Sequence, residues 1–236
     1  MLFRSSSQAQ RLLPRLGFRR AGEMKIYARP LRIWRQFLDR PGCGPARRAA
    51  LAARNLLWRL QAGAGLGGRG WALERVERPL PAHVAWFAAP GAGGGAGSLH
   101  SADSLRYLLA CPGARVSLWQ AAEAGRPRAL ILLAVAGPQA RVADLRVDQD
   151  TPRAWAAAYA AAMAAALEEG AHEIAAGATG ALAGSGLAAS GFRVRAVKPV
   201  WLRGGGRLLA ADAPLRLQMA DSDGFFVFDA GDPYLT

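Results

Sequence analysis

Three short runs separated by turn-forming clusters constrain the fold of this chain more than any other feature of its sequence. The runs are Arg115 to Ala122, Ala129 to Ala136 and Arg141 to Asp148. Between them lie residues 123–127, with a Gly and a Pro, and residues 137–139, which begin Gly-Pro. Gly and Pro favour tight turns, so three strands joined in this way predict an antiparallel meander.

The third run shows the strict alternation of a strand with one buried face. We expect Ala143, Leu145 and Val147 on one face, because side chains in a strand repeat with a period of two. The opposite face then carries the polar residues Asp144, Arg146 and Asp148.

A helix with marked ends follows the meander. Thr151 is a suitable N-cap, Pro152 suits the first helical position and Gly170 suits the residue after the end. Between them four large residues recur at intervals of four, which predicts a core-facing stripe on an alanine-rich helix. They are Trp155, Tyr159, Met163 and Leu167.

The rest of this region is predicted to be a strand, a helix and a last strand. Residues 171–176 are a short apolar run typical of a buried strand, and residues 179–190 form a weaker helix that contains two glycines. Gly191 ends that helix. The final strand is expected to place five apolar residues on one face: Phe192, Val194, Ala196, Val200 and Leu202.

The N-terminal part of the chain alternates helices, one long strand and glycine-rich connectors. Helices are predicted over 5–15, 31–38, 46–60, 82–88 and 101–110, with strands over 19–31 and 71–78. Residues 63–68 match the letters of GxGxxG, but a helix precedes them and a strand-like run follows. A dinucleotide site requires the reverse order, so residues 61–70 are a flexible connector. Residues 89–97 are predicted to be a loop.

A short stretch near the start of the chain repeats the junction before the last strand. Residues 13–19 and 187–193 each contain a short helix that ends in Gly-Phe-Arg and runs into a strand. This junction, together with three antiparallel strands followed by helix, strand, helix and strand, resembles the GNAT superfamily of acyltransferases. The resemblance implies a mixed α/β (α+β) GNAT-like fold. The repeat predicts a tandem arrangement: residues 1–31 as the remnant of a first copy, truncated at its N-terminus, 32–70 as a basic helical linker and 71–236 as a GNAT-like domain.

Composition excludes several classes of protein. No run approaches the eighteen or so apolar residues that a membrane span needs, and arginines interrupt the N-terminus where a signal peptide needs an apolar core. Two cysteines, Cys43 and Cys111, provide neither a disulfide framework nor a metal spacing. A cytoplasmic protein is therefore expected. The net charge of +13 lies almost entirely before Leu60, where fourteen Lys/Arg face two acids. Two interpretations of this basic surface remain open. It is either a solvated arginine-rich face or a surface that attracts nucleic acid or anionic lipid.

The resemblance implies acetyl transfer from acetyl-CoA to an amine of a small molecule or peptide. The positions that match the cofactor site are Leu145, Val147, Thr151, Arg153 and Ala154. The family's phosphate loop, Gln/Arg-x-x-Gly-x-Gly/Ala, is absent from the matching residues 148–154, which contain no glycine and have two aspartates and a proline. The Tyr that the family often places four residues before Gly-Phe is Leu187 here.

No catalytic group can be assigned from spacing. His172 is a candidate base, although a histidine beside Ile174 is also typical of a core, and Trp155 and Tyr159 are expected in the core. His83, His100, Asp103 and Glu173 have no partner predicted by spacing. Three hypotheses follow: a GNAT-type N-acetyltransferase with a degenerate second copy, a non-catalytic GNAT-like scaffold or recognition module, and a basic surface binder of nucleic acid or anionic lipid.

Overall fold

The computed structural model describes residues 11–35, 43–61, 70–89, 100–203, 215–221 and 234–236. Its centre is a seven-stranded sheet in the order β2-β3-β4-β5-β6-β1-β7. Neighbouring strands are antiparallel except for β5 and β6, which run parallel. The strands are β1 Phe18–Pro30, β2 Ala72–Val76, β3 Arg115–Glu123, β4 Arg126–Ala136, β5 Gln139–Val147, β6 Glu173–Ala178 and β7 Arg193–Arg203.

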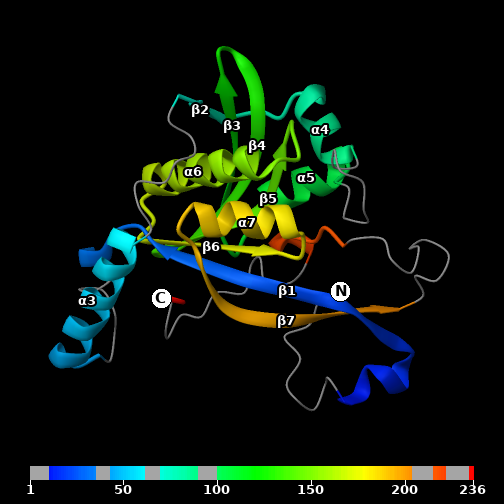
Figure 1. The fold of residues 1–236 in the computed structure, drawn as a ribbon. Helices are drawn as coiled ribbons and strands as arrows, with labels where there is room; N and C mark the ends of the chain where they lie inside the picture. The colour runs from blue at the N-terminus through cyan, green and yellow to red at the C-terminus, as the bar shows by residue number, and fades with distance from the viewer. Residues whose placement is uncertain (1–10, 36–42, 62–69, 90–99, 204–214, 222–233) are drawn as a thin grey trace.

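Helices cover both faces of this sheet and bury a separate core on each (Figure 1). Tyr159 of α6 and Leu187 of α7 pack in the first core, and Phe87 of α4 and Leu105 of α5 pack in the second. The helices are α3 Pro45–Gln61, α4 Pro81–Ala88, α5 Ala102–Leu109, α6 Pro152–Glu168 and α7 Ala181–Ala189, with 3-10 turns at Pro14–Leu16 and Met219–Asp221. The predicted mixed fold and the antiparallel meander are confirmed.

The N-terminal strand β1 lies inside the sheet, between β6 and β7. Its residues Lys25 to Pro30 pair with β6, and its residues Phe18 to Ala28 pair with β7. Residues predicted to belong to a first-copy remnant therefore share backbone hydrogen bonds with the GNAT-like domain. Their origin in a first copy stays a prediction.

The predicted alternation of β5 is wrong at Ala143, because the strand contains a β-bulge there. Leu133 pairs with Val142, whereas the adjacent Leu132 pairs with Asp144, which leaves Ala143 as an extra residue. Ala143 consequently packs in the core under α4 and α5, while Leu145 packs in the core under α6. The bulge turns Asp144 toward the same side as Ala143 and buries its carboxylate.

Helix α6 begins and ends where the sequence predicts. The Thr151 side chain accepts a hydrogen bond from the Ala154 N–H, Pro152 occupies the first turn, and Gly170 adopts a φ of 84°. The predicted stripe holds for Trp155 and Tyr159, which are buried, but not for Leu167, which is 38% exposed. A spacing of four residues drifts by about 40° per step around an α-helix, so the stripe leaves the core face by its fourth member.

Helix α7 contains Gly184 and Gly186, and neighbouring residues leave no room for a side chain at either position. A Cβ atom on Gly186 would lie 2.5 Å from the Trp155 Cβ, and one on Gly184 would lie 2.9 Å from the Tyr27 hydroxyl oxygen. Close packing of α7 on α6 therefore depends on the missing side chain.

The predicted apolar face of the last strand is only partly correct. Phe192 and Val200 are buried, but Val194 is 45% exposed. The pairing of Ile26 with Ala196 and of Tyr27 with Val194 skips Arg195, so a second irregularity breaks the alternation, and β7 lies at the edge of the sheet. Residues 5–10 of the helix predicted over 5–15 lie outside the described residues, and the described part of that prediction ends in the 3-10 turn Pro14–Leu16. The second half of the helix predicted over 31–38 and most of both connectors also lie outside the described residues.

Candidate functional site

The parallel strands β5 and β6 separate at one end, and a pocket opens between them. Their pairing runs from Gln139 with Glu173 to Val142 with Ala176 and stops there, although β5 continues to Val147 and β6 to Ala178. The pocket has a volume of about 590 Å³. Backbone edges that stop pairing expose unused donors and acceptors, so this end of the sheet is suited to binding a ligand.

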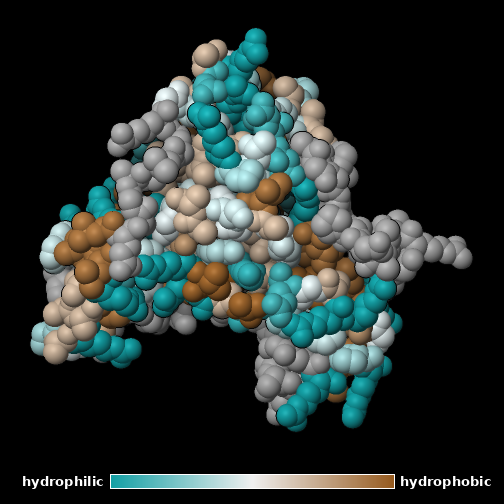
Figure 2. Space-filling model, viewed as in Figure 1, coloured by the Kyte–Doolittle hydropathy of each residue, from teal (hydrophilic) through white to brown (hydrophobic). Residues whose placement is uncertain are grey.

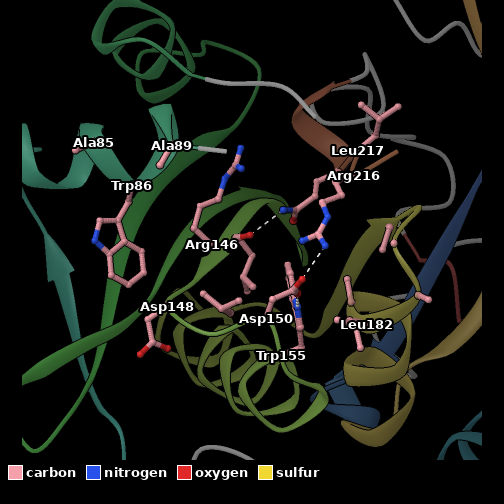
Figure 3. A pocket seen from close by; sticks show the side chains of 17 residues that line it. Ala85, Trp86, Ala89, Arg146, Asp148, Asp150, Trp155, Leu182, Arg216 and Leu217 are labelled. Atoms are coloured by element: carbon pink, nitrogen blue, oxygen red, sulfur yellow. Dashed lines mark hydrogen bonds and ion pairs between the residues drawn. The ribbon is translucent and has the colours of Figure 1, made fainter. Parts of the chain in front are cut away.

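Residues from several separate parts of the chain line this pocket (Figure 3). Its walls are mainly apolar and include two tryptophans, one from α4 and one from α6. Its polar groups are contributed by the end of β5, the β5–α6 loop and residues 216–218. The principal lining residues are Trp86, Arg146, Asp148, Asp150, Trp155, Leu182, Arg216 and Gln218.

Asp150 joins the start of α6 to the C-terminal segment at the pocket wall. The Trp155 indole Nε1 donates to Asp150 Oδ1 over 2.7 Å, and Arg216 Nη2 donates to Oδ2 over 2.7 Å. Burial alone would raise the pKa of Asp150, but these two hydrogen bonds and the charge of Arg216 lower it below its usual range. Asp150 is therefore a carboxylate at neutral pH, and Trp155 serves both the core and the pocket wall.

Asp148 is held by an arginine from the neighbouring strand. Arg128 Nη1 of β4 donates to Asp148 Oδ2 over 2.6 Å, and the same guanidinium contacts Glu123 over 2.9 Å. The hydrogen bonds that Arg128 donates to Asp148 and to Glu123 raise the pKa of Arg128. The pocket thus contains two aspartates and two arginines, and each aspartate is already ion-paired.

Asp144 is the buried centre of a polar cluster beside the pocket. Its Oδ2 lies 3.0 Å from His100 Nε2 and 2.9 Å from Arg146 Nη2, and its Oδ1 accepts from the Leu145 N–H over 2.7 Å. The Arg146 guanidinium also lies 5.9 Å from the centre of the Phe87 ring. A buried carboxylate is stable only when it is paired and hydrogen-bonded, as Asp144 is here.

The chain's own residues 215–218 lie across the separated strands. On the β6 side, Thr179 Oγ1 donates to the Leu215 carbonyl over 2.6 Å and accepts from the Leu217 N–H over 2.8 Å. On the β5 side, Gln218 Nε2 donates to Asp144 Oδ1 over 2.7 Å and to the Leu145 carbonyl over 2.8 Å. The β5 edge at Leu145 is thereby hydrogen-bonded within the chain.

The predicted cofactor residues divide into two groups. Leu145 and Val147 line the pocket, but Thr151, Arg153 and Ala154 are not among its lining residues. Thr151 instead caps α6, Ala154 is buried and Arg153 is exposed.

Acetyl-CoA does not fit the groups around the start of α6. The pyrophosphate would need backbone N–H donors at the helix N-terminus. Here Pro152 has no N–H, and the Ala154 N–H is already bonded to Thr151. The carboxylates of Asp148 and Asp150 line the adjoining pocket, and the pantetheine arm would need the β5 edge that Gln218 contacts. The degeneracy of the phosphate loop stays a prediction from the sequence.

The other candidate residues lie outside the pocket. His172 precedes β6 at its opposite end, where its Nδ1 is 3.1 Å from the Tyr234 hydroxyl. Glu173 is fully buried at that same end. His83 contacts Gln120 Oε1 over 3.2 Å, and Asp103 forms an exposed ion pair with Arg106. Among the residues that the structure describes, no three His, Cys, Asp or Glu side chains gather as a metal site.

Sequence reasoning missed Trp86, Arg216 and Gln218. Trp86 lies on a helix of only eight residues, where periodicity says little about direction. Arg216 and Gln218 belong to a segment without periodic pattern, and only the fold shows that it crosses the strand ends. Asp144 was placed on the polar face of β5 by alternation, and the β-bulge that buries it has no signal in the sequence.

Comparison with known proteins supports the fold. No family model matches the sequence, and no curated protein matches it significantly. Solved structures with a similar fold include a GCN5-related N-acetyltransferase from Anabaena variabilis ATCC 29413, which is 11% identical with a TM-score of 0.50; the match covers 85% of this chain and 44% of that chain. They also include a conserved protein from Enterococcus faecalis V583 described as a probable N-acyltransferase, which is 10% identical with a TM-score of 0.51; the match covers 81% of this chain and 42% of that chain. The chain has the GNAT-like fold of these proteins and spans less than half of their length.

Proposed function

We propose that this domain is a recognition module of N-acyltransferase type that binds an amine-bearing acyl acceptor in the pocket between β5 and β6. The observation that carries the proposal is the pocket itself, which opens where β5 and β6 stop pairing. The proposal also rests on the GNAT-like fold and on the poor fit of a diphosphate at α6.

The composition of the pocket indicates the kind of ligand. Trp86, Trp155 and Leu182 offer apolar surface, whereas Arg146, Asp148, Asp150 and Arg216 provide balanced charge at its edge. A small molecule or peptide end with an apolar body and a charged amine matches this mixture. In this proposal the acyl donor is not held at the N-terminus of α6, and chemistry belongs to another GNAT-like copy.

A panel of primary amines and lysine peptides tests this function by isothermal titration calorimetry. Trp86→Ala should weaken binding of an active compound at least about tenfold, because an aromatic wall of the pocket is lost. Trp34→Ala is the matched control, because Trp34 is 68% exposed and does not line the pocket. Equal loss in both variants, or no amine bound at millimolar concentration, would reject the proposal.

A second candidate function is acetyl transfer by this chain itself. One observation favours it: the contact to the Leu145 carbonyl at the pocket is made by the Gln218 side chain, and a side chain can withdraw. Titration of acetyl-CoA into wild type and Gln218→Ala separates the two candidates. The recognition module predicts no binding by either protein, and the enzyme predicts binding that Gln218→Ala strengthens.

A further inference from the structure

Helix α3 is amphipathic, but it does not contact the domain through its apolar face. Its half-buried or buried residues include Leu51, Asn55 and Trp58. The Trp58 indole Nε1 donates to the Gly191 carbonyl over 2.9 Å, and the Arg193 guanidinium lies 4.8 Å from the centre of the Trp58 ring. These contacts fix the orientation of the helix and determine which of its faces meets solvent.

The face that α3 leaves exposed is its apolar face. Seven exposed alanines and leucines lie within an arc of about 120° around the helix axis. Leu56, Leu57 and Leu60 are 44%, 59% and 70% exposed. The four alanines are Ala46, Ala49, Ala50 and Ala53. A contiguous apolar face of this kind indicates a binding surface rather than scattered exposed residues.

Arginines border this apolar face. The helix contains Arg47, Arg48, Arg54 and Arg59 and no acidic residue. Arg47 and Arg59 are exposed and lie on opposite sides of the apolar arc. Burial lowers the pKa of Arg29 in β1, and the nearby positive charge of Arg59 lowers it further. At the end of the molecule where α3 lies, Figure 2 shows hydrophobic residues next to hydrophilic ones.

We infer that α3 docks this domain on the surface of an anionic lipid bilayer. The leucines enter the boundary between headgroups and acyl chains, and the bordering arginines contact lipid phosphates. The inference concerns attachment to one leaflet: in the described part of the chain, no helix is long and apolar enough to cross a membrane. It is independent of the proposed function, because α3 does not line the pocket.

Charge and apolarity together favour a bilayer over two other partners. A nucleic acid would pair with the arginines but would leave the leucines in water. A second copy of α3 would bring eight arginines together with no acid on either helix to offset them, which repulsion disfavours. An anionic bilayer surface, in contrast to these two partners, satisfies both the leucines and the arginines.

Vesicle co-sedimentation tests the inference with phosphatidylcholine vesicles, pure or mixed with phosphatidylglycerol. Wild type should bind the mixed vesicles and not the pure ones. The triple variant Leu56→Gln, Leu57→Gln, Leu60→Gln should bind at least about tenfold more weakly. Arg47→Gln and Arg59→Gln should each weaken binding about fivefold. Circular dichroism checks that each variant is folded. We expect all of them to fold, because the replaced side chains are exposed.

Matched control variants distinguish binding through α3 from nonspecific binding by other exposed residues. Leu80→Gln, Tyr107→Gln and Val197→Gln replace three exposed apolar residues elsewhere, and Arg106→Gln replaces an exposed helical arginine. These variants should bind mixed vesicles as wild type does. Binding unchanged in the α3 variants would overturn the inference. The inference would also be overturned if wild type did not bind mixed vesicles but self-associated or bound DNA, and the triple leucine variant abolished that association. The apolar face of α3 would then be assigned to that partner.

Discussion

The two ends of the β5–β6 pair bury a carboxylate each, but they surround it differently. At the paired end, Glu173 accepts from Gln139 Nε2 over 2.7 Å and from the Leu235 and Thr236 N–H groups, each over 2.8 Å. At the separated end, Asp144 contacts His100, Arg146 and Gln218 beside a pocket. Both carboxylates are contacted by C-terminal residues. At the paired end the buried Arg141 guanidinium also donates to Gln139 Oε1 over 2.8 Å, so both ends contain charged side chains. The comparison shows that the separated end differs because its charged side chains lie next to an open volume.

Removing each carboxylate should produce the largest difference between the two ends. Glu173→Ala should lower the free energy of unfolding by about 3 kcal/mol, because several buried donors lose their acceptor. Asp144→Ala should cost about 1 kcal/mol, since Arg146 and Gln218 line the pocket and can be hydrated there. Urea unfolding measures both. An equal or greater loss in Asp144→Ala would mean that the two ends are equally closed.

The pocket wall should be sensitive to a single methyl group. Gly186→Ala should cost about 2 kcal/mol, because the added Cβ would lie 2.5 Å from the Trp155 Cβ. Gly180→Ala is the matched control, since Gly180 lines the pocket directly but has no atom within 4 Å of the added Cβ and has an ordinary φ of −74°. Thermal unfolding compares them. Similar melting temperatures would show that α7 can shift away from α6 without cost.

The two ends should also respond to pH with opposite signs. Burial raises the pKa of Glu173 above its ordinary 4.5, so its stabilising contribution is complete below that pH and falls as pH rises through the folded value. The pKa of Asp150 is lowered from 3.8, so its contribution is present above that pH and is lost as pH falls through the folded value. Each slope is at most about 1.4 kcal/mol per pH unit.

Urea unfolding across pH 3 to 8, roughly the range in which carboxylates and histidines titrate, checks these signs. Glu173→Gln should flatten the decline on the alkaline side, and Asp150→Asn should flatten the decline on the acidic side. Slopes that persist unchanged in these variants would assign the pH dependence to other groups.

The smallest predicted effect concerns the cap of α6. Thr151→Ala should cost about 1 kcal/mol, because the Ala154 N–H loses its side-chain acceptor. Thr151→Ser, which keeps the hydroxyl, should be close to wild type. Amine binding in the pocket should not change in either variant, because Thr151 does not line it. A large loss of amine binding would place the start of α6 in the ligand site.

The sequence predicts the local elements of this fold well and their partners less well. Turn residues and the Thr-Pro cap specify the meander and α6 because they act within a few residues. The bulge at Ala143 escapes a period-of-two argument, since the register of β4 determines it. The insertion of β1 between β6 and β7 is also hidden, because strand order depends on contacts far apart in the chain.

The candidate site was predicted only in part for the same reason. Leu145 and Val147, which the GNAT resemblance implies, do line the pocket. Their role in binding a cofactor stays a prediction, as does the degeneracy of the phosphate loop in residues 148–154. Arg216 and Gln218 reach the pocket from a segment some seventy residues after β5, with contacts to Asp150 and Asp144 that no spacing rule connects.

A crystal structure determined with acetyl-CoA and an amine that binds the domain tests the central claim most directly. We predict the amine between Trp86 and Trp155, Gln218 still bonded to Asp144 and Leu145, and no diphosphate at Thr151 to Ala154. Coenzyme A seated on the α6 N-terminus, with its pantetheine arm along β5 in place of Gln218, would contradict the account.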